Sequence, residues 1–241
     1  MLRPIHPSNA ASFPREFRAP DDTWFGFAAR ARILVVNTEL VDDSDIPRSI
    51  LELTEPRWAG KVGIAKPLFG TTATHAACLF AMLGSDRARK FFLDLKRNQV
   101  QILGGNKQVA IQVSTGSLPV GLTDTDDAIV ELEKAQPVKL VYLDAKPNEM
   151  GTLFIPNTLA ALKNSPNPNH AERLADYLLG PSVEAALAEG PSAQIPLNPS
   201  VHAVLRTETP ATIHAMDVDW SEALGKWNET ARFIAQQFSG P

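Results

Sequence analysis

The 241-residue sequence has one cysteine, Cys78, two tyrosines and no long apolar run. A single cysteine excludes an internal disulfide and a structural zinc site built from cysteine ligands. No stretch approaches the ~18 consecutive apolar residues that a membrane-spanning helix needs. Lys and Arg total 23 against 27 Asp and Glu, for a net charge of -4. Without a basic excess to neutralise a phosphate backbone, binding of nucleic acid is disfavoured.

What the sequence does contain is typical of a folded globular protein. Hydrophobic residues make up 44% and charged residues 21%, which is enough to build one large domain or two small ones. The segment Met1–Pro7 has neither the apolar region nor the cleavage site of a signal peptide. Extended connecting chain is predicted at the start by four prolines, Pro4, Pro7, Pro14 and Pro20.

Strand-like and helix-like segments alternate along the chain. Apolar, β-branched runs predict strands at 30–37, 61–65, 100–103, 118–122, 138–143 and 151–155. Apolar or amphipathic runs predict helices at 49–53, 72–82, 86–98, 107–113, 126–136, 169–179, 182–189 and 220–238. Such alternation predicts an α/β fold with a mainly parallel sheet.

Three strand-to-helix junctions are the first candidates for a binding site: Pro67–Ala73, Leu103–Lys107 and Leu122–Asp127. The carboxyl ends of strands line the ligand crevice in open α/β sheets. The helix N-termini that follow present backbone N–H groups and a partial positive charge, which suit an anion. Ordinary capping of the helices by Thr, Asn and Asp is the alternative interpretation.

The first two junctions offer donors for an anionic ligand. Thr71, Thr72 and Asn106 carry side-chain donors, and Gly70 allows the backbone to approach a ligand closely. These four residues are predicted to bind ligand.

The third junction places Asp124, Asp126 and Asp127 within four positions. One or two aspartates in a first helical turn are explained by the helix dipole. Three at one strand end also suit a hard cation with oxygen ligands or a ligand ammonium group. Both interpretations stay open at this point.

The remaining candidate functional residues are two arginines and two residues of an apolar helix. Arg30 and Arg32 alternate along a predicted strand and so share a face, where an arginine is either a buried ion-pair partner or a fork for an anionic ligand. His75 and Cys78 lie in an apolar helix and are predicted to pack in the core.

Catalytic motifs are missing from the sequence. There is no G-x-S-x-G, no P-loop and no G-x-G-x-x-G. Because no nucleophile and base stand out, an enzyme is not favoured. A hydrolase or transferase would need turnover that depends on Asp126.

Five segments together resemble the solute-binding proteins of ABC transporters, of the ferric-iron-binding type. They are Trp24–Asn37, Leu53–Ala65, Gly121–Ala128, Gly151–Thr158 and Gln194–Asn198, and the resemblance covers residues 15–235.

The resemblance implies an α/β, two-lobed periplasmic-binding fold of type II, with solute held between lobes and delivered to a membrane permease. The part of the family that this sequence resembles begins after the signal peptide and the first βαβα segment. We therefore expect an incomplete N-terminal lobe. Residues 1–35 and 150–197 are assigned to that lobe, and 36–149 and 198–241 to the C-terminal lobe. A periplasmic location is implied by the family, and self-association is expected through the incomplete lobe.

The same resemblance predicts the class of ligand. The family's iron binders use a tandem tyrosine pair, whereas the corresponding positions here are Asp126 and Asp127. Phenolate ligation of iron is therefore not supported. The turn at 70–73 corresponds to the place where the family holds a co-bound anion, and Asn106 to another anion contact.

The resulting prediction is a metal ion with an anion, or a small zwitterion such as an aminophosphonate, and no other cofactor. Asp126 and Asp127 are the predicted metal ligands; the predicted ligand-binding residues are Gly70, Thr71, Thr72, Asn106, Asp124 and Arg30. The alternative is a remnant of such a protein that no longer binds ligand.

Overall fold

The computed structural model describes residues 1–238, which form two compact units. Unit 1 consists of Met1–Arg30 and Phe154–Thr209, and unit 2 of Ala31–Leu153 and the chain from Pro210 onward. The chain therefore passes between the units three times. The lobe boundaries predicted from the sequence are at residues 35, 149 and 197. The assignment of each unit to a lobe stays a prediction.

Unit 1 is built on a small part of the sheet. Strand β7 (Phe154–Leu162) lies between β1 (Leu2–Arg3) and β2 (Trp24–Asn37), and β1 pairs with β7 antiparallel. Helices α5 (Pro168–Leu178) and α6 (Pro181–Glu189) accompany these strands.

A buried glutamate organises unit 1. Glu184 of α6 is fully buried and accepts hydrogen bonds from the backbone N–H groups of Ala28 at 2.6 Å and Asn198 at 2.7 Å. The N–H of Leu197 also donates to it. In addition, the backbone N–H groups of Ala29 and Ile195 donate to each other's carbonyl oxygens, at 2.7 and 2.8 Å. The 194–198 segment is thus held against β2, because a buried carboxylate needs several donors.

Unit 2 contains the larger part of the sheet. Strand β3 (Val62–Ala65) is parallel to β4 (Gln101–Leu103) and to β5 (Val120–Asp124). The second half of β2 is antiparallel to β5 and to β6 (Val138–Val141). The sheet is therefore mixed, and the prediction of a mainly parallel sheet is wrong.

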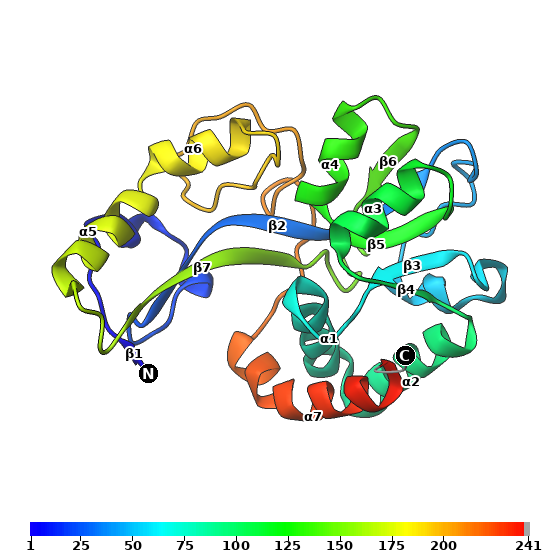
Figure 1. Ribbon diagram of the computed structural model, residues 1–241, viewed down its shortest axis with the longest axis horizontal. Coiled ribbons are helices and arrows are strands. Elements are labelled where there is room, and N and C mark those ends of the chain that lie inside the picture. The colour runs from blue at the N-terminus through cyan, green and yellow to red at the C-terminus, as the bar shows by residue number, and fades with distance from the viewer. Residues whose placement is uncertain (239–241) are drawn as a thin grey trace. The chain divides into compact units, whose positions relative to one another are not determined.

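Five α-helices cover the two faces of this sheet. They are α1 (Gly70–Leu83), α2 (Ser85–Arg97), α3 (Asn106–Ser114), α4 (Thr125–Glu133) and α7 (Trp220–Phe238). Figure 1 shows α3 and α4 on one face and α1, α2 and α7 on the other. The predicted helices are confirmed, except that 49–53 is a 3-10 helix, Ile50–Thr54, followed by a second one at Pro56–Trp58.

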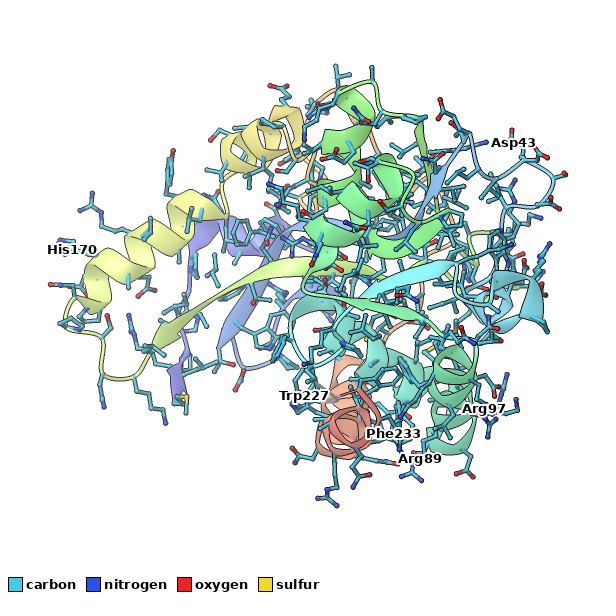
Figure 2. All side chains as sticks on the ribbon, turned by 45° about the vertical axis from the view of Figure 1, so that its right-hand side comes forward. Asp43, Arg89, Arg97, His170, Trp227 and Phe233 are labelled. Atoms are coloured by element: carbon cyan, nitrogen blue, oxygen red, sulfur yellow. The ribbon has the colours of Figure 1, made fainter. Side chains whose placement is uncertain are left out.

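The core under α1, α2 and α7 is aromatic. Phe92 packs against Phe80, with ring centroids 6.3 Å apart, and against Phe238 at 6.2 Å. On the outer side of α2, Arg89 lies over the ring of Phe233 and pairs with Glu229 at 2.8 Å (Figure 2). Within residues 1–238, no helix combines the length and the apolar character needed to cross a membrane.

Two glycines make room for side chains that pack closely against the sheet. Gly63 of β3 and Gly121 of β5 are directly paired. A Cβ at Gly121 would lie 2.4 Å from Cγ1 of Val109, and one at Gly63 would lie 2.6 Å from Cδ1 of Leu118. Both distances are far below van der Waals contact. Helix α3 therefore lies this close to β5 only because residue 121 is glycine, and Leu118 packs on β3 only because residue 63 is glycine.

We therefore expect Gly121→Ala to destabilise the protein by ~1–3 kcal/mol, the usual effect of overpacking a filled core. Urea unfolding followed by circular dichroism measures the change. Gly225→Ala is the matched control, because Gly225 is exposed in α7 with open space around it. It should be neutral or stabilising by ~0.5–1 kcal/mol. Equal effects of the two substitutions would contradict this account of the packing.

Candidate functional site

The candidate site lies in unit 2, where β3, β4 and β5 lead into α1, α3 and α4. The residues that precede these helices are Phe69, Gly105 and Asp124, and none of the three caps its helix with a side-chain hydrogen bond. The side chains of these three N-cap residues therefore do not cap the helices. Each helix instead presents its partial positive charge without a side-chain acceptor from its own N-cap residue.

A hydrogen-bonded group of five residues occupies this end of the sheet. We call it the strand-end cluster: Arg32, Thr71, Thr72, Asn106 and Asp124. Oδ1 of Asp124 accepts from Nη1 of Arg32 at 2.6 Å. Oδ2 accepts from Oγ1 of Thr71 at 2.6 Å and from Nδ2 of Asn106 at 2.8 Å.

The remaining bonds link the starts of α1 and α3. Oδ1 of Asn106 accepts from Oγ1 of Thr72 at 3.2 Å and from Nη1 of Arg32 at 3.1 Å. Nδ2 of Asn106 also donates to Oγ1 of Thr71 at 2.8 Å. The three junctions predicted from the sequence therefore converge on one network.

Arg32 reaches the cluster through the pairing of β2 with β5. The antiparallel register places Arg32 directly opposite Asp124. The Arg32 side chain is completely buried and that of Asp124 is 5% exposed. In the part of the chain that the structure describes, Nη2 of Arg32 is buried and has no hydrogen-bond acceptor. Arg32 is thus a buried ion-pair partner, one of the two roles considered for it.

His75 and Cys78 of α1 pack beneath the cluster, as predicted. Nδ1 of His75 accepts a long hydrogen bond of 3.4 Å from Nε of Arg32. Burial, and secondarily the charge of Arg32, holds the pKa of His75 well below its usual value. Burial also raises the pKa of the Cys78 thiol to about 12, so this thiol is unreactive at neutral pH.

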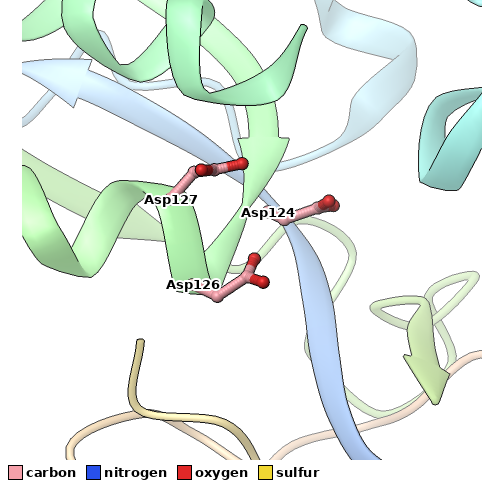
Figure 3. Close-up of side chains that lie close together, drawn as sticks. All are labelled: Asp124, Asp126 and Asp127. Carbon is pink, nitrogen blue, oxygen red and sulfur yellow. The ribbon is translucent and has the colours of Figure 1, made fainter. Parts of the chain in front are cut away.

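Asp126 and Asp127 adjoin the cluster in the first turn of α4. Figure 3 shows their carboxyl groups gathered with that of Asp124 where β5 runs into α4. One carboxylate oxygen from each of the three residues lies within 4.8 Å of the others. Asp126 and Asp127 are half-buried, whereas Asp124 is buried. Carboxylates at this spacing are suited to a hard cation or an ammonium group.

Arg30, which is also predicted to bind ligand, belongs to unit 1. Its guanidinium donates to Oδ1 of Asn157. Arg32 takes part in the cluster. The unbroken apolar run at 33–36 that follows Arg32 is the sequence signal that could have distinguished the two arginines. Gly70 begins α1 with φ of +57°, a conformation that favours glycine.

The low pKa of His75 makes stability depend on pH. Below pH 6.5 the unfolded chain protonates His75 and the folded protein does not, so stability falls as the pH falls, by at most ~1.4 kcal/mol per pH unit. We expect His75→Gln to lose less stability than the wild type when the pH is lowered from about 7.5 to about 5.5. These values lie ~1 unit above and below the ordinary pKa of histidine. Urea unfolding at each pH measures the free energy of unfolding. His170→Gln, at an exposed position in α5 (Figure 2), is the control. Equal losses in the His75 variant and the wild type would contradict the prediction.

Comparison with known proteins places this geometry in context. The family model described as "Bacterial extracellular solute-binding protein" matches residues 1–224. Iron uptake protein A2 of Synechocystis sp. is 26% identical over 199 residues, which cover 78% of this chain and 56% of that protein. The chain thus spans a little over half the length of the relatives it matches.

Solved structures show the same fold. Iron-bound HitA from Pseudomonas aeruginosa has a TM-score of 0.86 at 22% identity, covering 97% of this chain and 76% of HitA. AfuA from Actinobacillus pleuropneumoniae, solved with exogenous fructose-6-phosphate bound, has a TM-score of 0.84 at 22% identity, covering 100% of this chain and 77% of AfuA. The fold is therefore the α/β fold of two-lobed periplasmic binding proteins.

Proposed function

Because the chain belongs to the family of bacterial extracellular solute-binding proteins, we propose that it is the solute-binding component of an ABC importer. It acts outside the cytoplasm and delivers its solute to a membrane permease, without chemical conversion. The names of its relatives, which include an iron uptake protein and an iron-bound HitA, support a transport role.

The observation that carries the proposal is the convergence of three junctions in unit 2. Residues distant in sequence, from Thr71 to Asp127, meet at the ends of neighbouring strands. The network combines uncapped helix starts with carboxylates, so it presents both partial positive and negative charge. This combination suits a solute that has both signs of charge.

The proposed solute is a metal ion accompanied by an anion, or a small zwitterion such as an aminophosphonate. Asp126 and Asp127 bind the cationic part, because carboxylate oxygens are the ligands that hard cations prefer. The anionic part faces the backbone N–H groups at the starts of α1 and α3. Tyr142 and Tyr177 are the only tyrosines and are far apart in sequence. Iron held by a tandem tyrosine pair is therefore not proposed.

Neutralising the two acidic residues tests the site. We expect Asp126→Asn/Asp127→Asn to weaken binding of the cationic solute by at least ~tenfold, which corresponds to a loss of ~1.4 kcal/mol. A thermal-shift screen with Mn²⁺, Ca²⁺, ferric citrate, 2-aminoethylphosphonate and fructose-6-phosphate identifies the ligand, and calorimetry measures the affinity.

Asp42→Asn/Asp45→Asn is the matched control for this experiment. It removes the same charge from an exposed loop of unit 2. If none of the probes binds, or if both double variants lose affinity equally, the proposed site is wrong.

Self-association through unit 1 is a second candidate property. Leu162 of β7, Leu174 and Tyr177 of α5 are 57%, 56% and 65% exposed. Large apolar side chains exposed on neighbouring elements favour association. The ligand-incompetent remnant considered from the sequence would associate in this way and bind none of the probes.

We expect the wild-type protein to sediment as a dimer or larger species at micromolar concentration. Leu174→Ser/Tyr177→Ser should shift it toward the monomer, because the substitutions remove exposed apolar surface. Val204→Ser, at a position 80% exposed in unit 1, is the control. A monomeric wild-type protein would exclude this association.

A further inference from the structure

Asp124 stands at the N-cap position of α4. As the residue before α4 it has extended backbone, with φ of -105° and ψ of 152°, which is the conformation of an N-cap residue. Its side chain nevertheless makes no hydrogen bond to the helix it precedes. The carboxylate is directed to other partners instead.

Those partners are the donors of an anion site. Asp124 accepts from the Arg32 guanidinium, the Thr71 hydroxyl and the Asn106 amide, all between 2.6 and 2.8 Å. Thr71 and Asn106 are the side chains predicted from the sequence to bind a ligand anion. In the structure, these donors are therefore already engaged by a carboxylate from the same chain.

The Arg32 charge explains why a carboxylate is needed there. The Arg32 side chain has no exposed surface, and a buried guanidinium requires a negative partner. Asp124 supplies one and satisfies both of its own oxygens in doing so. The pair contributes no net charge, and the carboxyl groups of Asp126 and Asp127 lie beside it.

We infer that Asp124 is a built-in anion, which occupies the donors of Arg32, Thr71 and Asn106 and allows the site to bind a cationic solute without a separate small anion. The part concerning the cationic solute rests on the proposed function and restricts it, because no co-bound anion then uses the side chains of Thr71 and Asn106. The part concerning the donors rests on the three hydrogen bonds alone.

An anion from solution would meet two obstacles at this position. The one Arg32 donor without an acceptor among residues 1–238, Nη2, is buried and is not reached from solvent. An oxyanion would also lie next to the carboxylates of Asp124, Asp126 and Asp127 and would be repelled by them. A small anion therefore enters only when the Asp124 carboxylate is gone.

The wild-type protein provides the first test. Sodium formate should leave the Tm where sodium chloride of the same ionic strength leaves it, because the donors are occupied. A saturable increase in Tm that is specific to formate would overturn the inference.

Asp124→Ala provides the second test by removing the built-in carboxylate. The variant should have a lower Tm than the wild type, and formate should restore it in a saturable manner, by at least ~5 °C relative to chloride at saturation. Asp42→Ala, which removes an exposed carboxylate in unit 2, should respond to formate like the wild type. An Asp124→Ala protein that folds but responds equally to formate and chloride would contradict the inference.

Calorimetry with Mn²⁺ separates this inference from the proposed function. The wild-type Kd for Mn²⁺ should be the same with and without formate, to within about twofold. A Kd at least ~tenfold tighter in the presence of formate would overturn the inference that Asp124 is a built-in anion. If Mn²⁺ does not bind under either condition, the proposed hard-cation solute is wrong. The formate responses of the wild type and Asp124→Ala then still decide the role of Asp124.

Discussion

The buried ion pair between Arg32 and Asp124 is the interaction on which the site depends. Removing two charges from water is costly, and the cost is offset only when the remaining donors and acceptors are also satisfied. Here both oxygens of Asp124 are satisfied through Thr71, Asn106 and Arg32, whereas Nη2 of Arg32 has no acceptor among residues 1–238. The starts of α1 and α3 and the end of β5 are consequently joined to β2 by one network, so that none can shift without breaking bonds to the others.

The sheet of unit 2 brings these groups together. Parallel pairing of β3 with β4 and β5 directs three strand ends to the same edge. Antiparallel pairing of β2 with β5 then places Arg32 opposite Asp124. Gly121 allows α3, and with it Asn106, to lie close to the sheet. The strand-end cluster therefore follows from strand pairing and from a residue that lacks a side chain.

Local sequence patterns were sufficient to locate the elements and most of the site. The alternation of β-branched strands with apolar or amphipathic helices predicted each α-helix of the structure, and the polar residues after three strands predicted the convergent junctions. The sheet was expected to be mainly parallel because alternating elements favour crossover connections. That expectation failed for β2, whose apolar run identifies a strand but carries no information about its partner or direction.

The sequence by itself determined which residues are apolar, where helices begin and which strand ends carry Thr, Asn and Asp. The tertiary structure alone decided that Arg32 pairs with Asp124, that Asp124 accepts from three distant donors instead of capping α4, and that Glu184 is buried against backbone amides. The reason is physical: helix and strand propensities act over a few residues. The partner of a buried charge is set by strand register and helix packing between segments as far apart as Arg32 and Asp124.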